Sequence, residues 1–489
     1  MAAYSNFSTG RRKLLARALI ALAGAAIGKG SRAADAPSSV MLQLGAYLAE
    51  AGSRPLPDDV LEKSKHHIVD TFAAMISGSL LPPGSAALQY ARTGGERGGV
   101  ATIIASTLTA GPVEAAFVNA MLAQSDETDD SNEFSQSHPG CAIVPAAFAM
   151  AEKFGVDGNR FVRAVTLGYD VGPRVTISFR ALDFRNNSHK STHAIAEVFG
   201  SAAAAGCIAG LDAHKMQWLL DYTAQQSAGI GAWTRDTQHM EKAFVFAGMP
   251  AKNGVMAALL VDSGFTGLDD IFSGTDNYFL AYAPNANPDE LIKDLGKRYE
   301  IARTNIKKWS VGSPIQAPLD AMDNIFKKYE VAPENVRSIV VRLAHTEARI
   351  VDNREIPDIC LQHMVSVMLL DKTVSFKAAH DKARMGDPEI LRVRAKVELV
   401  SSDELEALEP ARHGIVEITL NDGTMLTDHV AHVRGTADNP MDRGEVVRKA
   451  TDLMEPVLGK ANSTELIDKL MTLEKLNNLR GLRRFLQRA

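Results

Sequence analysis

The sequence predicts a mainly α protein, with a large all-helical domain and a smaller α+β domain inserted as a lid. Two observations predict this fold class. Apolar residues recur at helical spacing from Asp58 onward, whereas β-branched runs with partial alternation occur only after about Asn285. Helical spacing then returns after Asn439 and Pro440. We therefore expect a helical domain over residues 39–284, a lid over residues 285–440, and C-terminal helices over residues 441–489 that return to the first domain.

The helical domain is expected to begin its regular pattern at Pro57 and Asp58, which are suitable residues for a helix start. The apolar positions that follow fall mostly at helical spacing. Six further helices are expected at residues 112–123, 143–154, 158–171, 194–209, 212–227 and 248–262.

The second domain contains the strand-like segments. The β-branched content predicts strands at residues 338–343, 394–399 and 414–420. Asn421 to Thr424 supply a turn signal that joins the last strand to residues 425–427 in a hairpin. Helical patterns at residues 314–328 and 362–370 lie among these strands, and helices at residues 445–458 and 465–487 are expected after them.

Composition excludes several classes of protein. The 489 residues include 46% hydrophobic and 23% charged residues, which is typical of a soluble globular chain. A net charge of -5 argues against nucleic acid as a partner, because phosphate-binding proteins carry a basic excess. Cys141, Cys207 and Cys360 are far apart and show no CxxC spacing, so we expect three buried free thiols.

The first 33 residues contain six basic residues and no acidic one. Arg11 and Arg12 precede an apolar run at residues 14–27, which is shorter than a membrane span of about 20 residues and suits a signal peptide. The pattern resembles a twin-arginine export signal, so we expect a periplasmic protein with no membrane span in its mature form. The alternative is a frayed basic N-terminus or an amphipathic helix.

An acidic stretch is the most unusual feature of the sequence. Five carboxylates lie between Asp126 and Glu133, and His138 follows closely enough to act with them as an acid or base. A calcium loop is one alternative, but Ser131 and Ser137 stand where such a loop needs glycine and glutamate. A solvated acidic loop between two helices is the other alternative.

Other candidate ligands and cations are weaker. His189, His193 and Glu197 share one face if they lie in one helix, yet two histidines without a third strong ligand do not predict a metal site. A polar loop over residues 233–242 offers Arg235 and Lys242 for an anion, and Lys307 offers a third cation. Exposed lysines without a role are the alternative. GxGxxG, Walker, HExxH and GxSxG motifs are absent from the sequence.

Residues 119–131 (NAMLAQSDETDDS) and 138–146 (HPGCAIVPA) resemble the signature region of the MmgE/PrpD family. Further landmarks follow in the same order at residues 168–171, 199–203, 248–254 and 307–309. The resemblance implies a helical main domain, an α+β lid, a homodimer and an active site between the domains. It also implies proton transfer next to a carboxylate of a small polycarboxylate, without a metal or organic cofactor.

Carried over position by position, the resemblance places Glu127, Asp129, Asp130 and Ser131 on the family's D-x-D-D-T stretch. His138 matches the histidine of its HP pair, Lys307 matches its lid lysine, and Lys242 lies within one residue of its loop lysine. Three family histidines fall on Ser191, Phe246 and Gly312 in this chain.

We therefore predict a cofactor-independent lyase of the dehydratase or decarboxylase type that acts on a small di- or tricarboxylate. The alternatives are an epimerase or isomerase of a carboxylate, and a periplasmic carboxylate-binding protein without activity. The expected catalytic residues are Glu127, Asp129, Asp130, Ser131, His138 and Lys307, and the expected substrate-binding residues are Lys242, Arg235 and His193.

Overall fold

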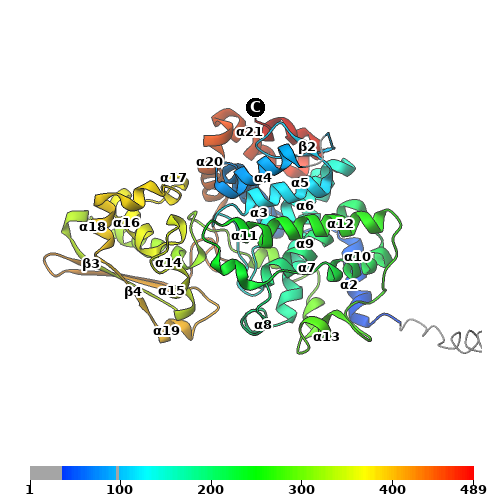
Figure 1. Cartoon of the computed structure of the whole chain (residues 1–489), viewed down its shortest axis with the longest axis horizontal. Helices are drawn as coiled ribbons and strands as arrows, with labels where there is room; N and C mark the ends of the chain where they lie inside the picture. The colour runs from blue at the N-terminus through cyan, green and yellow to red at the C-terminus, as the bar shows by residue number, and fades with distance from the viewer. Residues whose placement is uncertain (1–35, 95–97, 489) are drawn as a thin grey trace, which may run out of the picture.

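The computed structural model describes residues 36–94 and 98–488 and is mainly helical (Figure 1). The twin-arginine-like segment lies outside the described residues. The principal helices of the first domain are α2 (Ser39–Glu50), α3 (Asp58–Gly78), α4 (Pro82–Thr93), α5 (Pro112–Ala123), α6 (Gly140–Phe154), α7 (Gly158–Ser178), α8 (Ala181–Ser188), α9 (Thr192–Ala209), α10 (Ala213–Gln225), α11 (Met240–Ala243), α12 (Met249–Asp262) and α13 (Tyr278–Tyr282).

Helix α9 is the centre of the first domain, and α6, α7, α10 and α12 pack around it. Small residues allow the close approach of α7 to α9. A Cβ atom on Gly172 would lie 2.2 Å from the carbonyl oxygen of Ala196, and one on Gly168 would lie 2.7 Å from that of Gly200. Only glycine therefore fits at these two positions.

Helix α7 is longer than the sequence indicates, since the prediction ended it at Val171 and it continues to Ser178. The extension passes through Pro173 and carries the buried Arg174. The Arg174 guanidinium pairs with Asp170 one turn earlier and donates to the carbonyl oxygens of Lys293 and Arg298. These tertiary contacts stabilise a helix that Gly172 and Pro173 alone would end.

The second domain is a four-stranded sheet in the order β4-β3-β5-β6. Strand β3 (Val336–Leu343) pairs in parallel with β4 (Val397–Ser401) and antiparallel with β5 (Gly414–Leu420), which pairs with β6 (Met425–Val430). Helices α14 (Ser313–Lys328) and α16 (Leu361–Asp371) pack together and against this sheet (Figure 1). Shorter helices are α15 (His345–Val351), α17 (Phe376–Ala379), α18 (Pro388–Arg394) and α19 (Asp403–Glu406).

The strand predicted at residues 394–399 begins later. Helix α18 continues to Arg394, and β4 starts only at Val397. Asp387 caps this helix through the backbone N–H groups of Glu389 and Ile390, and Pro388 occupies its first turn. These helix-start signals keep the chain helical through Arg394, so the strand that the β-branched residues favour begins only at Val397.

Most buried apolar side chains of the described residues belong to two large cores. The second core spans Trp309 to Val433, later than the boundary expected at residue 285, because Leu291, Tyr299 and Ile306 pack in the first core. From Met441 the chain contributes to the first core again, and α20 (Arg443–Leu458) packs against α3.

The helix predicted over residues 465–487 is interrupted. Helix α21 (Lys460–Leu470) is followed by short 3-10 turns at Leu473–Lys475 and Leu479–Leu482, and then by α22 (Arg483–Leu486). The Asn478 side chain accepts a hydrogen bond from the Arg480 N–H, which favours a new turn over a continuous helix. Helices α20 and α21 both pack on α3 of the first domain (Figure 1).

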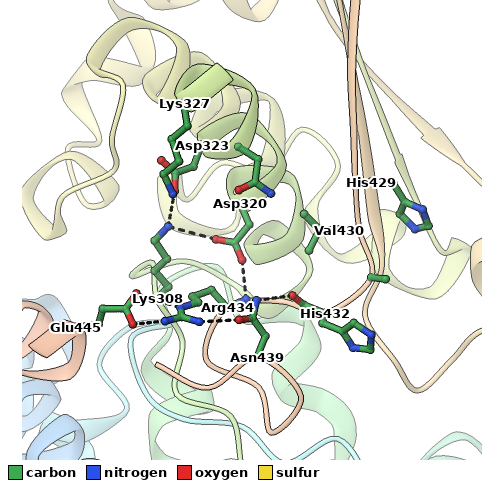
Figure 2. A pocket seen from close by; sticks show the side chains of 12 residues that line it. Lys308, Asp320, Asp323, Lys327, His429, Val430, His432, Arg434, Asn439 and Glu445 are labelled. Atoms are coloured by element: carbon green, nitrogen blue, oxygen red, sulfur yellow. Dashed lines mark hydrogen bonds and ion pairs between the residues drawn. The ribbon is translucent and has the colours of Figure 1, made fainter. Parts of the chain in front are cut away.

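The two chain segments that connect the domains, one entering the second domain and one leaving it, lie beside each other. Each is called a crossing below. Lys308, on the segment entering the second domain, pairs with Asp320 and Asp323 (Figure 2). Arg434, on the segment that leaves it, pairs with Glu445 and donates its backbone N–H to Asp320 at 2.7 Å. Asp320 therefore joins both crossings, beside a polar cavity of about 370 Å³.

Two of the described helical segments, Thr192–Ala209 and Met240–Asp262, have the length and apolar composition to cross a membrane. Within the protein, 94% of the first segment and 61% of the most apolar 18-residue stretch of the second are buried. Core helices of folded domains have the same properties, so the two segments are weak evidence of a membrane span.

Candidate active site

The acidic loop between α5 and α6 is buried where the two domains meet. Asp126, Glu127 and Asp129 are each at most 5% exposed, so the alternative of a solvated loop is wrong. The backbone of Ser131 exchanges hydrogen bonds of 3.0 and 2.8 Å with Asn305, just before the second domain begins. The carboxylates are therefore enclosed by protein.

Glu127 lies between two lysines and a histidine. The Lys242 ammonium pairs with its Oε1, and Lys307 Nζ lies 3.6 Å from its Oε2. His239 Nδ1 lies 3.8 Å from Oε1. Burial alone would raise the pKa of Glu127, but the charges of Lys242 and Lys307 hold that pKa well below its ordinary value. Glu127 is consequently ionised at neutral pH.

Asp129 joins a histidine to the second lysine. Its Oδ2 lies 3.0 Å from His138 Nδ1, and its Oδ1 lies 3.5 Å from Lys307 Nζ. Burial lowers the pKa of Lys307, but Asp129 and Glu127 more than offset this and raise it, so the ammonium stays charged. Because the Asp129 carboxylate accepts a hydrogen bond from Nδ1–H, the His138 tautomer with an unprotonated Nε2 is favoured. That nitrogen can take or return a proton.

Glu197 of α9 holds the backbone of His138. Its Oε1 accepts the His138 N–H at 2.9 Å, and the side chain is fully buried. Burial, with the nearby charges of Asp129 and Asp130, holds the pKa of Glu197 well above its ordinary value. The side chain is therefore a neutral acid, and its hydrogen bond to the His138 backbone fixes the position of the histidine.

Asp130 and Ser131 face other neighbours. Asp130 Oδ2 lies 2.7 Å from His67 Nδ1 and accepts from the Tyr169 hydroxyl at 2.6 Å, while Oδ1 accepts the Gly140 N–H at 2.9 Å. These contacts fasten the loop to helices of the first domain. Ser131 lines a small cavity beside Lys307. Asp130 thus supports the loop, and Ser131 lies near the lysine.

His193 and Phe246 form an aromatic wall next to His138. Their rings stack with centroids 3.8 Å apart, and the His193 ring lies 5.2 Å from that of His138. Trp233 packs edge-on against Phe246 at 4.6 Å. Burial lowers the pKa of His193 well below its ordinary value, so it is neutral. His193 therefore lies beside Phe246, where the resemblance places a family histidine.

The remaining candidates are not brought into this cluster. His189 is exposed and lies in a left-handed conformation with a φ of 59° at the end of α8, so the expectation that it shares a helix face with His193 is wrong. Helix α9 starts only at Thr192, with Ser191 as its N-cap. Arg235 is exposed and forms no ion pair with any described residue.

A second ion-pair cluster crosses from the acidic loop to the second domain. His380 Nε2 lies 3.0 Å from Asp126 Oδ2 and 3.8 Å from Asp358 Oδ2. Burial lowers the pKa of His380, but the two carboxylates more than offset this and raise it to about 9. Burial also raises the pKa of Asp358 to about 7.

Sequence reasoning missed the roles of His239, His380 and Asp358, and it considered Glu197 only as a metal ligand beside His189 and His193. His239 carried a signal, because it lies in the polar loop that offered Arg235 and Lys242. His380 and Asp358 come from short turns far along the chain, and no motif links them to the acidic loop. Within residues 36–94 and 98–488, no group of three or more His, Cys, Asp or Glu side chains could hold a metal ion.

A helical domain and an α+β domain here enclose acid–base side chains and buried cations, an arrangement suited to an active site between two domains. Sequence comparison assigns the family. The model of the MmgE/PrpD N-terminal domain matches residues 42–291, and that of the MmgE/PrpD C-terminal domain matches residues 309–473. The chain therefore belongs to the MmgE/PrpD family.

Relatives cover nearly the whole chain at low identity. Cis-aconitate decarboxylase of Aspergillus terreus is 24% identical over 93% of this chain and 97% of its own length. Cis-aconitate decarboxylase of Homo sapiens is 25% identical over 86% of this chain and 89% of its own length. A cis-aconitate decarboxylase-like protein of Aspergillus oryzae, oryM, is 26% identical over 63% of this chain and 66% of its own length.

Proposed function

We propose that this protein is a cofactor-independent lyase, of the dehydratase or decarboxylase type, that acts on a small di- or tricarboxylate. One observation carries the proposal: the buried Asp129 carboxylate contacts both His138, a potential base, and Lys307, a buried cation. Lys242 adds a second cation on the neighbouring Glu127. The relatives named cis-aconitate decarboxylase support a carboxylate as the substrate.

The two lysines would hold the substrate. A carboxylate arriving between Lys242 and Lys307 replaces part of their pairing with Glu127, which then turns toward His239. As a proton leaves the carbon next to that carboxylate, negative charge develops on the carboxylate oxygens. Fixed ammonium groups in a buried site stabilise this charge more strongly than water does.

His138 would move the proton. In dehydration, its Nε2 removes the hydrogen, the C–H electron pair forms the double bond, and the hydroxyl leaves as water after taking a proton from a neighbouring acid. In decarboxylation, the C–C bond breaks to release carbon dioxide, and protonated His138 delivers its proton to the carbanion. Asp129 holds the ring and stabilises its charged form in both cases.

The second domain would act as the lid. It supplies Asp358 and His380, which join it to Asp126 of the acidic loop, and Lys307 lies on the segment that leads into it. Closure of this domain would exclude water from the site and complete the cation pair, which favours the charged transition state.

The test is turnover of a panel of hydroxy and unsaturated di- and tricarboxylates by the native protein and by His138→Ala. General acid–base groups contribute about 10²–10⁴-fold to rate, so the variant should lose activity by that factor. His214→Ala is the matched control, because His214 is exposed and pairs with Asp269 rather than with the acidic loop. Unchanged turnover by His138→Ala would remove His138 from the mechanism.

Export and assembly are part of the proposal. Residues 1–33 would direct the chain to the periplasm by the twin-arginine route, and the mature protein would be a homodimer. N-terminal sequencing of periplasmic protein tests the first point, and a retained Met1 would contradict it. Light scattering of the purified protein tests the second.

A further inference from the structure

Three of the 13 histidines of the chain lie at one end of the sheet in the second domain. His413 immediately precedes β5, His429 lies in β6, and His432 follows β6 on the crossing that leaves the domain. The pairing of β5 with β6 places His429 opposite Ile415, so it lies beside His413 although the two are 16 residues apart in the sequence. The fold therefore concentrates imidazoles outside the acidic loop.

Two of these rings lie at a separation that suits a shared metal ion. His413 Nδ1 lies 3.2 Å from His429 Nε2, and the ring centroids are 5.4 Å apart. A transition-metal ion binds imidazole nitrogen at about 2.0–2.1 Å, so two nitrogens on one ion lie roughly 2.8–3.4 Å apart, from square-planar to tetrahedral geometry. The observed distance between the two nitrogens falls within this range.

A hydrogen bond between the two rings is the alternative explanation of this contact. A hydrogen bond requires a proton on one of the two nitrogens, whereas an ion requires a lone pair from each. Burial and the neighbouring His429 and His432 lower the pKa of His413, so its ring is neutral at pH 7. His413 is half-buried and His429 is exposed, so an ion can reach both nitrogens from solvent.

His432 offers a third imidazole. Its side chain is 63% exposed, and its Nδ1 lies 3.6 Å from Asp438 Oδ2. A carboxylate beside one ring nitrogen is a common partner of metal-ligating histidines, and it leaves Nε2 for the ion. Figure 2 shows the rings of His429 and His432 turned away from the ion pairs of Lys308 and Arg434. Because no three described side chains are placed to share an ion as they stand, the exposed His432 ring must rotate to complete the set.

The ligand type selects the ion. Neutral imidazole suits Zn²⁺, Cu²⁺ and Ni²⁺, whereas Mg²⁺ and Ca²⁺ prefer oxygen ligands. The carboxylates of the neighbouring polar cavity already pair with cations, since Asp320 and Asp323 pair with Lys308, and Glu445 pairs with Arg434. The three imidazoles are therefore the ligands that this end of the sheet offers to an ion.

We propose that His413, His429 and His432 form a binding site for one transition-metal ion of the Zn²⁺ or Cu²⁺ type. The bound ion joins the start of β5 and the end of β6 to the crossing that leaves the second domain. This site is separate from the proposed lyase function, because the described hydrogen bonds, ion pairs and ring contacts of these histidines involve only residues of the second domain and its crossing.

The experiment is calorimetric titration of the full-length protein, purified without a polyhistidine tag, with ZnCl₂, CuCl₂ and MgCl₂. We expect saturable binding of one Zn²⁺ or Cu²⁺ ion that depends on these histidines, a lower Kd for Cu²⁺ than for Zn²⁺, and no binding of Mg²⁺. Absence of Zn²⁺ and Cu²⁺ binding, or Mg²⁺ binding of equal strength, would overturn the proposal.

Substitutions at exposed or half-buried positions locate the site. His429→Gln removes one of the two close nitrogens and should raise the Kd for Zn²⁺ at least tenfold, because even the loss of a residue that only supports a ligand costs about 10–100-fold. His413→Gln should have the same effect. His214→Gln is the matched control, since His214 is exposed and pairs with Asp269 in the first domain. Equal Kd values in His429→Gln and His214→Gln would show that the ion binds elsewhere.

Electron paramagnetic resonance of the Cu²⁺ complex counts the nitrogen ligands. We expect coupling to three nitrogens in the native protein and to two in His432→Gln. Identical spectra of these two proteins would contradict the assignment of His432 as a ligand. Neither measurement involves turnover, so the metal site and the lyase can each fail without the other.

Discussion

Lys307 is the residue on which the electrostatics of the site depend most. It is 3% exposed and lies within 3.6 Å of Glu127 and 3.5 Å of Asp129, and it also donates to the Glu127 carbonyl oxygen at 2.9 Å. Removing one partner of a buried ion pair leaves the other charge without compensation. The lysine therefore supports stability as well as substrate binding.

We expect Lys307→Met to lower the free energy of unfolding by about 3–5 kcal/mol, because two buried carboxylates lose their shared cation. Urea unfolding followed by circular dichroism measures this. Lys327→Met is the control, since Lys327 forms an exposed pair with Asp323 and such pairs contribute about 1 kcal/mol or less. Equal losses of stability in the two variants would show that the buried ion pairs contribute no more to the free energy of unfolding than the exposed pair.

A second expectation concerns Glu197, which acts on His138 through its backbone. Glu197→Gln keeps an acceptor for the His138 N–H and should retain near-native activity. Glu197→Leu leaves that N–H without a partner and should cost about 1–3 kcal/mol of stability. It should also lower kcat more than it raises KM, because it displaces a proton-transfer group. If the glutamine variant is as impaired as the leucine variant, Glu197 is needed as an ionisable group and the positioning role is wrong.

At this scale, sequence reasoning succeeds where chemistry is concentrated in one stretch. Glu127, Asp129 and His138 could be grouped because they lie within twelve residues. Lys242 and Lys307 were candidate cations on their own, and only the family resemblance joined them to this group. His380 could not be found, because its charge depends on Asp126 and Asp358, which only the fold brings beside it.

At the scale of elements, helix α20 connects the C-terminal segment to the site. Asp442 and Glu445 form a capping box at its first turn, and Lys449 on the same helix donates to the Thr128 carbonyl oxygen of the acidic loop at 3.0 Å. Lys449 also pairs with Asp70 of α3 at 2.6 Å. A stable α20 therefore helps to hold the loop in place.

We expect Asp442→Ala to lower the free energy of unfolding by about 1 kcal/mol, because the Glu445 N–H loses its side-chain acceptor. Asp442→Asn should lose much less, since asparagine is an equally good N-cap. Chemical denaturation of the three proteins measures the difference. A stable alanine variant would mean that packing of α20 on α3, rather than its cap, decides its stability.

Helix and strand types were predictable where a local signal agreed with tertiary packing. Helix α5 and strand β5 have the predicted bounds. The extension of α7 past Pro173 was not predictable, because it depends on the contacts of Arg174 with residues far along the chain. Element types thus follow from periodicity, whereas their ends depend on buried partners.

At the scale of the whole molecule, His380 joins the two domains through a charge that depends on pH. Its pKa of about 9 lies above the value of roughly 6.5 for an unfolded chain. The stabilisation is therefore complete below about pH 6.5 and is lost as the pH rises through about 9. Asp126 and Asp358 are the carboxylates that gain from this charge.

We expect the native protein to lose on the order of 2 kcal/mol between pH 7 and pH 10 through this group. His380→Gln should be less stable at pH 7 and should show a smaller loss. Urea titrations of both proteins at pH 7 and pH 10 measure the two losses of stability. Subtracting one loss from the other removes the contributions of other titratable groups. His345→Gln alters an exposed histidine pair with Asp403 and is the control. Parallel pH curves for the native protein and His380→Gln would contradict the assignment.

The central claim is that His138 transfers a proton at the carbon next to a carboxylate held by Lys242 and Lys307. Its most direct test is deuterium exchange from D₂O into that carbon, followed by proton NMR over a panel of small hydroxy and unsaturated carboxylates. We expect the native protein to exchange or convert at least one of them, and His138→Ala to do so about 10²–10⁴-fold more slowly. Exchange at the same rate in both proteins, or none with any carboxylate, would contradict the claim.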